Sequence, residues 1–152
     1  KAVRTRVGHS YIKAEMRKLN AIFGGEHSGH FYFRDNWFAD SGLIAFLITL
    51  ELVSIEGKPL SELLKPLDKG VRSGEINSVV NDVQGKLQAL EEKFGKDARS
   101  VDHLDGITVD YGEWWFNVRP SNTEPLLRLN VEANNQALME QKRDEVLAFI
   151  RS

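Results

Sequence analysis

The chain has 152 residues, of which 41% are hydrophobic, enough to form one core or two small ones. Twenty basic residues nearly balance 22 acidic ones, and the net charge of -2 argues against nucleic acid or an anionic membrane as the partner. The lack of cysteine excludes disulfides and is compatible with a cytoplasmic location, which we expect.

The pattern before residue 65 predicts alternating helices and strands. A helix is expected over residues 10–19, and the apolar runs 21–23 and 31–33 indicate two strands around a glycine-rich loop. A longer helix is expected over residues 41–54, with Asp40 as its N-cap. Together these elements are typical of an α/β layer.

The helix expected over residues 41–54 is apolar on most of its surface. The stretch from Leu43 to Val53 is too short to cross a bilayer, which needs about 20 apolar residues. We therefore expect a helix that is buried on more than one side. Its apolar residues are Leu43, Phe46, Leu47 and Leu50 on one face, with Ile44 and Ile48 beside them.

Proline and glycine among charged residues at 65–70 indicate a linker. We place the domain boundary there, with a first domain over residues 1–67 and a second over residues 68–152. After the linker, residues 76–80 are expected to form a strand, and Asp82 suits the N-cap of the following helix. The apolar face of that helix is formed by Val83, Leu87, Leu90 and Phe94.

Three strands are expected in quick succession after this helix, because apolar and polar residues alternate. Their short connections favour antiparallel pairing. A closing helix over residues 135–151 can cover one face with Met139, Val146 and Ile150. The second domain is therefore predicted to be α+β, one antiparallel sheet with two helices on one face. The inward residues are Ile107, Val109 and Tyr111, then Trp114, Phe116 and Val118, then Leu127, Leu129, Val131 and Ala133.

The turn after the second of these strands, residues 119–125, reads Arg-Pro-Ser-Asn-Thr-Glu-Pro. The guanidinium of Arg119 offers a planar fork that matches two phosphate oxygens, and the expected alternation leaves it exposed at the end of the sheet. The hydroxyls of Ser121 and Thr123 and the amide of Asn122 can bind further oxygens. The same residues also suit an ordinary polar turn without a ligand.

The loop at residues 24–30, Gly-Gly-Glu-His-Ser-Gly-His, is bounded by glycines that allow close approach to a ligand. Glu26 and Ser28 are two residues apart and can bind neighbouring sugar hydroxyls from one side of the loop. His30 suits proton transfer near neutral pH. His27 and His30 could instead bind a metal, but their spacing matches no usual zinc pattern, so we expect no metal here.

Together these motifs resemble the α-D-phosphohexomutase family, closest to its bacterial phosphomannomutase/phosphoglucomutase members. The resemblance covers nearly the whole chain, and the order and separation of the motifs make it specific. It is carried by residues 7–13 (Val-Gly-His-Ser-Tyr-Ile-Lys), 25–30, 74–77 (Gly-Glu-Ile-Asn) and 119–125.

The resemblance implies an enzyme of four domains, with a phosphorylated serine in the first and an aspartate-rich magnesium loop in the second. Neither loop occurs in these 152 residues. We therefore expect a fragment with the end of the third domain and all of the fourth, inactive alone. Mg²⁺ is expected to bind the missing N-terminal part, and the expected partners are those N-terminal domains and a phosphorylated hexose.

The implied reaction is the reversible conversion of a hexose 6-phosphate to the 1-phosphate, of mannose or glucose, through a 1,6-bisphosphate. The resemblance gives Glu26 and Ser28 the sugar hydroxyls O3 and O4, and residues 119–123 the phosphate. It gives His30 a general acid/base role, with His9 in support. A hinge within residues 65–71 would let the second domain close over the sugar.

Two alternatives are considered. Asn122 favours the mannose/glucose enzymes over phosphoglucosamine mutase, the second choice, whose members tend to have glycine there. A carbohydrate or anion-binding module without catalysis would keep both loops. We expect His103 to have a surface or packing role, and the strand tryptophans Trp114 and Trp115 to belong to the core more than to a sugar site.

Overall fold

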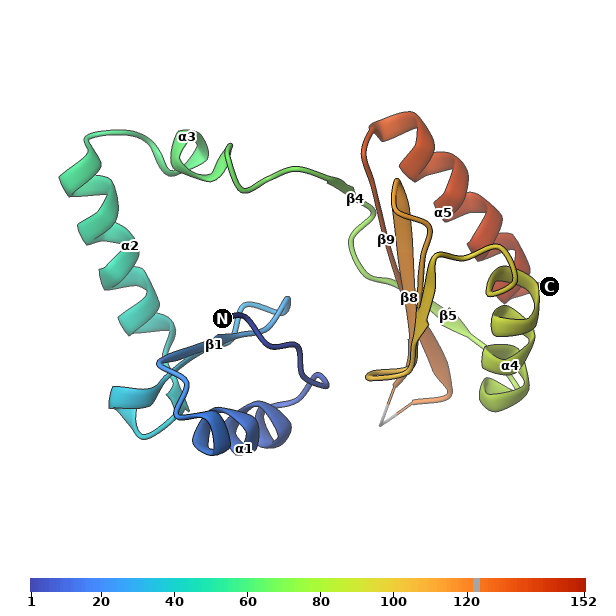
Figure 1. Ribbon diagram of the computed structural model, residues 1–152, viewed down its shortest axis with the longest axis horizontal. Coiled ribbons are helices and arrows are strands. Elements are labelled where there is room, and N and C mark those ends of the chain that lie inside the picture. The colour runs from blue at the N-terminus through green and yellow to red at the C-terminus, as the bar shows by residue number, and fades with distance from the viewer. Residues whose placement is uncertain (122–123) are drawn as a thin grey trace. The chain divides into compact units, whose positions relative to one another are not determined.

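The computed structural model of this chain describes residues 1–121 and 124–152. The chain divides into two compact units, residues 1–68 and residues 69–152. Figure 1 shows the helices α1 and α2 of the first unit and the sheet of the second. Each unit is described by itself below.

The first unit is built on a three-stranded antiparallel sheet in the order β1 (Phe23–Gly25), β2 (Phe31–Phe33) and β3 (Ala39–Asp40). The helix α1 (His9–Leu19) packs against it, and its Ile12 and Met16 enclose Tyr32 in a small core. A Cβ at Gly24 would lie 2.7 Å from Met16 Sδ, so glycine lets helix and strand approach this closely without a shift of the Met16 side chain. The expected helix and strand–loop–strand are confirmed.

Helix α2 (Gly42–Glu56) forms where expected, but it begins differently. Ser41, and not Asp40, is the N-cap, because the Ser41 side chain accepts a hydrogen bond from the backbone N–H of Ile44 at 3.2 Å. Asp40 is instead paired with Tyr32 at the edge of the sheet. The 3₁₀ turn η1 (Arg34–Asn36) precedes β3, and the short helix α3 (Leu60–Leu64) follows α2.

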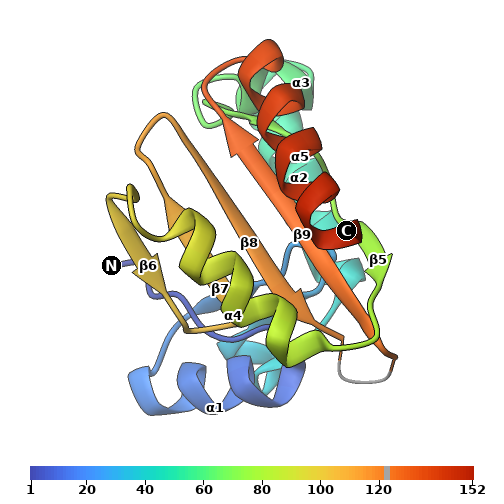
Figure 2. The same ribbon diagram turned by 90° about the vertical axis from the view of Figure 1, so that its right-hand side faces the viewer.

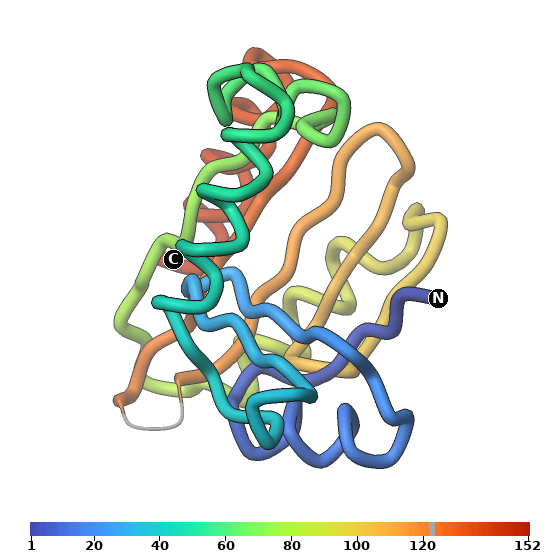
Figure 3. The backbone as a smooth tube through the Cα atoms, turned by 90° about the vertical axis from the view of Figure 1, so that its left-hand side faces the viewer, coloured from blue at the N-terminus to red at the C-terminus, as the bar shows by residue number. Residues whose placement is uncertain are grey.

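The expectation that α2 is buried is wrong for this chain. Within the described residues none of its side chains is buried, and Leu43 and Phe46 are 68% and 59% exposed. Figure 3 follows the backbone from the three short strands into α2, which extends away from them. The apolar pattern therefore predicts the helix correctly, but these residues provide no surface to cover it. In the described part of the chain, no helix is long and apolar enough to cross a membrane.

The second unit is one antiparallel sheet in the order β4-β9-β8-β7-β6, with β5 also paired to β9. The paired central strands are the longest, and the edge strands β4 and β6 were not predicted because they are only two and three residues long. The strands are β4 (Val71–Arg72), β5 (Ile76–Val79), β6 (Ser100–Asp102), β7 (Ile107–Asp110), β8 (Trp114–Pro120) and β9 (Leu126–Ala133).

Helices α4 (Val83–Phe94) and α5 (Gln136–Arg151) cover one face of this sheet, as Figure 2 shows. Asp82 caps α4 as expected, and Asn135 caps α5. The core contains the residues predicted to point inward, among them Phe116, Leu127 and Val146, all completely buried. The prediction of an α/β segment followed by a small α+β domain is confirmed.

Candidate functional site

The loop of residues 26–30 is the tip of the β1–β2 hairpin. Gly25 and Phe31 are the last paired residues, and the backbone N–H of Glu26 then donates to the carbonyl of His30 at 2.9 Å. The N–H of Gly29 donates to the carbonyl of Glu26 at 3.0 Å, and Gly29 has φ +84°, which favours glycine. The hydrogen bonds close the loop into a tight turn.

Glu26 is held within this turn by a buried side chain. The phenol of Tyr32 donates a hydrogen bond to Glu26 Oε1, and Tyr32 is completely buried. Burial raises the pKa of Tyr32 above its ordinary value, and the hydrogen bond to Glu26 and the charges of Glu26 and Asp40 raise it further. The phenol therefore remains a neutral donor beside the carboxylate.

The other side chains of the loop face solvent. Ser28 Oγ and His30 Nδ1 lie 2.9 Å apart in a hydrogen bond, and both residues are exposed. His27 is exposed as well. His9, the supporting histidine of the prediction, is the exposed first residue of α1. The structure thus joins Ser28 to His30 directly, and Glu26 to the core through Tyr32.

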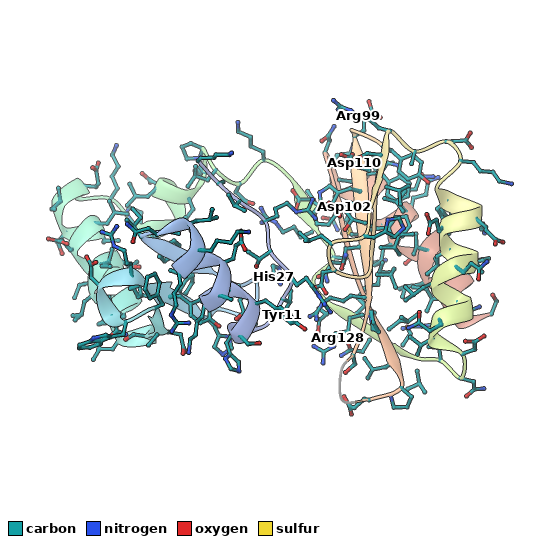
Figure 4. All side chains as sticks on the ribbon, turned by 60° about the horizontal axis from the view of Figure 1, so that its bottom comes forward. Tyr11, His27, Arg99, Asp102, Asp110 and Arg128 are labelled. Atoms are coloured by element: carbon teal, nitrogen blue, oxygen red, sulfur yellow. The ribbon has the colours of Figure 1, made fainter. Side chains whose placement is uncertain are left out.

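The phosphate-binding candidate Arg119 lies on β8, on the face away from α4 and α5. Its side chain is 17% exposed, less than expected, because Nη2 contacts Glu75 Oε2 at 2.7 Å. The other carboxylate oxygen of Glu75 accepts from Arg128 Nη1 at 3.1 Å. Figure 4 shows Arg128 on the side of the sheet away from α4. Glu75 therefore bridges two guanidinium groups.

A bulge brings Glu75 to this position. Arg72 pairs with Glu132 and Ile76 with Leu129, so three residues on one side, 73–75, lie opposite two residues of β9. Gly74 within the bulge has φ +70°. A bulge of this kind re-aims side chains at a sheet edge, and here it directs Glu75 toward the two arginines.

The backbone at Arg119 is fixed by a close contact with Gly106. A Cβ at Gly106 would lie 2.2 Å from the carbonyl oxygen of Val118 and 2.6 Å from Arg119 Cα, and the residue has φ +68°. Beyond the strand, the N–H of Ser121 donates to the carbonyl of Leu126 at 2.9 Å. The candidates Asn122 and Thr123 lie outside the described residues.

Sequence reasoning missed three residues at these two loops: Tyr32, Glu75 and Arg128. Residues 74–77 were part of the family pattern, but only the register of β5, β8 and β9 reveals what Glu75 contacts. Two other candidates have structural contacts. Trp114 is buried and stacked on Tyr111, and His103 contacts Glu91 at 3.0 Å on the surface. Trp115 is only partly buried.

The described residues contain no group of three His, Cys, Asp or Glu side chains that could hold a metal ion. The polar side chains at the two loops instead suit organic ligands. A carboxylate and a hydroxyl can bind sugar hydroxyl groups, and guanidinium groups can bind an anion.

Comparison with known proteins shows similarity along the whole chain. The model of the phosphoglucomutase/phosphomannomutase alpha/beta/alpha domain III matches residues 1–69, and the model of the phosphoglucomutase/phosphomannomutase C-terminal domain matches residues 75–149. The two matches follow one another without overlap, in the order of the two units.

Individual relatives agree with these matches. A protein of Xanthomonas campestris pv. campestris (strain B100) named as phosphohexose mutases is 44% identical over 95% of this chain. A phosphomannomutase of Escherichia coli (strain K12) is 42% identical over 97%. The chain spans 33% of the length of each.

A crystal structure has the same fold. It is that of a phosphoglucomutase/phosphomannomutase family protein from Burkholderia thailandensis, 33% identical, with a TM-score of 0.79 over 96% of this chain and 31% of that one. The matches to two successive domain models and to relatives over nearly all its residues lead to one conclusion. The chain belongs to the phosphoglucomutase/phosphomannomutase family, of which it carries sequence of domain III and of the C-terminal domain.

Proposed function

We propose that this chain is the sugar- and phosphate-binding part of a cytoplasmic phosphohexomutase that interconverts a hexose 6-phosphate and the hexose 1-phosphate. The observation that carries the proposal is the order of the two domain matches, which span the sequences of the two predicted ligand loops. The relatives named phosphomannomutase and the family description phosphoglucomutase/phosphomannomutase favour mannose or glucose as the sugar.

The hairpin loop of residues 26–30 is proposed to bind the sugar. The carboxylate of Glu26 accepts from hydroxyl groups, and the hydroxyl of Ser28 donates or accepts. His30, hydrogen-bonded to Ser28, moves a proton to or from the reacting hydroxyl, with His9 in support. Hydroxyl groups O3 and O4 are common to both orientations of the sugar, so one loop serves both halves of the reaction.

Arg119 is proposed to bind the phosphate that does not react. A guanidinium has five N–H donors, of which the contact with Glu75 uses one, and its fork matches two phosphate oxygens. Ser121, Asn122 and Thr123 are proposed as further ligands. A loop that recognises only a dianion accepts the phosphate on carbon 1 or carbon 6, as a mutase with a bisphosphate intermediate requires.

The remainder of such an enzyme would supply the phosphoserine and the Mg²⁺ site. We propose that Mg²⁺ binds in the part of the enzyme outside this chain, and the described residues offer no group of three His, Cys, Asp or Glu side chains for it. Phosphoryl transfer depends mainly on positioning and charge stabilisation, and this chain contributes both through its two loops. Closure of the C-terminal unit by a hinge within residues 65–71 would exclude water from the transfer.

The proposal is tested by turnover of glucose 1-phosphate and mannose 1-phosphate by the complete enzyme. Arg119→Ala removes a charged contact worth about 2–4 kcal/mol, so kcat/KM should fall about 30-fold to 1000-fold. Glu26→Ala should also impair turnover without unfolding the protein. Arg143→Ala and Glu92→Ala, which change a partly exposed residue of α5 and an exposed residue of α4, are matched controls. Normal turnover in both loop variants would contradict the proposal, and no turnover by the wild type would favour a binding module.

A further inference from the structure

We propose that Tyr32 is a positioning residue that fixes the sugar-binding carboxylate of Glu26. This inference rests on the proposed function of the hairpin loop. Tyr32 is not expected to touch the substrate, because it is completely buried beneath the loop.

The position of Tyr32 follows from the register of the sheet. It lies on the central strand β2, paired with Gly24 of β1 and Asp40 of β3. Glu26 is two residues beyond Gly24, on the diagonal from Tyr32, and a long side chain can reach such a neighbour. The phenol hydroxyl makes this contact with Glu26 Oε1.

The ring of Tyr32 is held by packing, just as its hydroxyl group is held by the hydrogen bond. Ile12 and Met16 of α1 pack around it, with Ala21 and Phe38 at the margin. A ring held in this way has little freedom to move, so its hydroxyl group is a fixed point relative to β1 and β2. Glu26, in contrast, is only partly buried and belongs to a turn. The hydrogen bond therefore anchors the partly exposed carboxylate to the buried ring.

The chemistry of the pair supports a role beyond core packing. A hydrogen bond to a charged group is stronger than one between neutral groups. Because the phenol is buried, water cannot take the place of Glu26 as its acceptor. Because Oε1 accepts from Tyr32, Oε2 is the oxygen left to bind a sugar hydroxyl. A glutamate without this hydrogen bond would lose rotamer freedom on binding the sugar. Glu26 has already lost that freedom before the sugar binds, so its entropic cost of binding is smaller.

The inference is tested in the complete enzyme with Tyr32→Phe, which removes the hydroxyl group and keeps the volume of the ring. We expect kcat/KM for mannose 1-phosphate to fall about tenfold to a hundredfold, as for loss of a hydrogen bond to a charged group. The loss should divide between kcat and KM as it does in Glu26→Ala. In the double variant, Tyr32→Phe should cause no further loss, because it acts only through Glu26.

The control is Tyr111→Phe, which removes a partly buried phenol that donates to the backbone carbonyl of Phe94 in the other unit. It should leave kcat/KM unchanged. Thermal unfolding of each variant shows whether the fold is kept. Wild-type activity of Tyr32→Phe, or an equal loss in the Glu26→Ala background, would overturn the inference, since either indicates a role in stability alone. Normal activity of Glu26→Ala would instead remove the sugar-binding role on which it rests, and the inference with it.

Discussion

Arg119 of β8 and Arg128 of β9 are directly paired across the sheet, and the carboxylate of Glu75 contacts both guanidinium groups. Like charges directly opposite one another destabilise a sheet, so the single carboxylate offsets a repulsion that the register creates. The arrangement keeps a net positive charge at the end of β8. This positive charge suits the phosphate site that we propose at Arg119.

We predict that Glu75→Gln destabilises the second unit by about 1–2 kcal/mol, since it removes the negative charge that contacts two partly buried arginines. The free energy of unfolding by urea checks this. Glu91→Gln is the matched control, because Glu91 pairs with His103 at an exposed position and its loss should cost less than about 0.5 kcal/mol. Equal stability of the two variants would contradict the role given to Glu75.

Gly106→Ala should destabilise the second unit by more than about 3 kcal/mol, because the new Cβ would overlap the backbone of Val118 and Arg119. Gly74→Ala is the control that distinguishes the effect of this clash from the effect of backbone strain. Gly74 also has a positive φ, but a Cβ there meets nothing within 4 Å, so we expect a loss of only about 1 kcal/mol. Unfolding midpoints of the two variants measure the difference, and similar values would show that the clash is relieved.

Residues 69–152 should fold when expressed alone, whereas residues 1–68 should not form a stable unit. The larger core lies entirely in the second unit, but only three side chains are buried in the core of the first, and its apolar helix α2 is exposed. Dispersed amide resonances and a cooperative thermal transition would confirm this for residues 69–152. A cooperative transition of residues 1–68 would show that α2 does not need a further surface.

The stability of residues 69–152 should decrease as the pH rises above about 10, the ordinary value for tyrosine. Burial raises the pKa of Tyr111, and the charges of Glu145 and Asp97 add to the effect. The folded state thus holds the phenol proton more tightly than the unfolded state. The stabilisation that results is complete below the unfolded pKa and is lost as the pH rises through the folded pKa. Urea midpoints at pH 8 and pH 11 should show a smaller decrease in Tyr111→Phe.

Much of this fold is predictable from the sequence because periodicity is local. Alternation along residues 107–133 identified the inward side chains of β7, β8 and β9, and the spacing of Leu87, Leu90 and Phe94 identified one face of α4. The N-cap of α2 was misplaced by one residue, because Asp40 and Ser41 are both good caps and the pairing of β2 with β3 decides between them. The short edge strands were missed because a few residues show no periodicity.

The sequence by itself determined the family and the main helices and strands, and it predicted the two ligand loops. Only the tertiary structure decided that Tyr32 holds Glu26 and that Glu75 joins Arg119 to Arg128. These contacts depend on sheet register and on one bulge, which bring together residues six and more than forty positions apart. The burial expected for α2 was not found, because hydrophobicity predicts that a helix needs a partner surface, and these residues do not provide it.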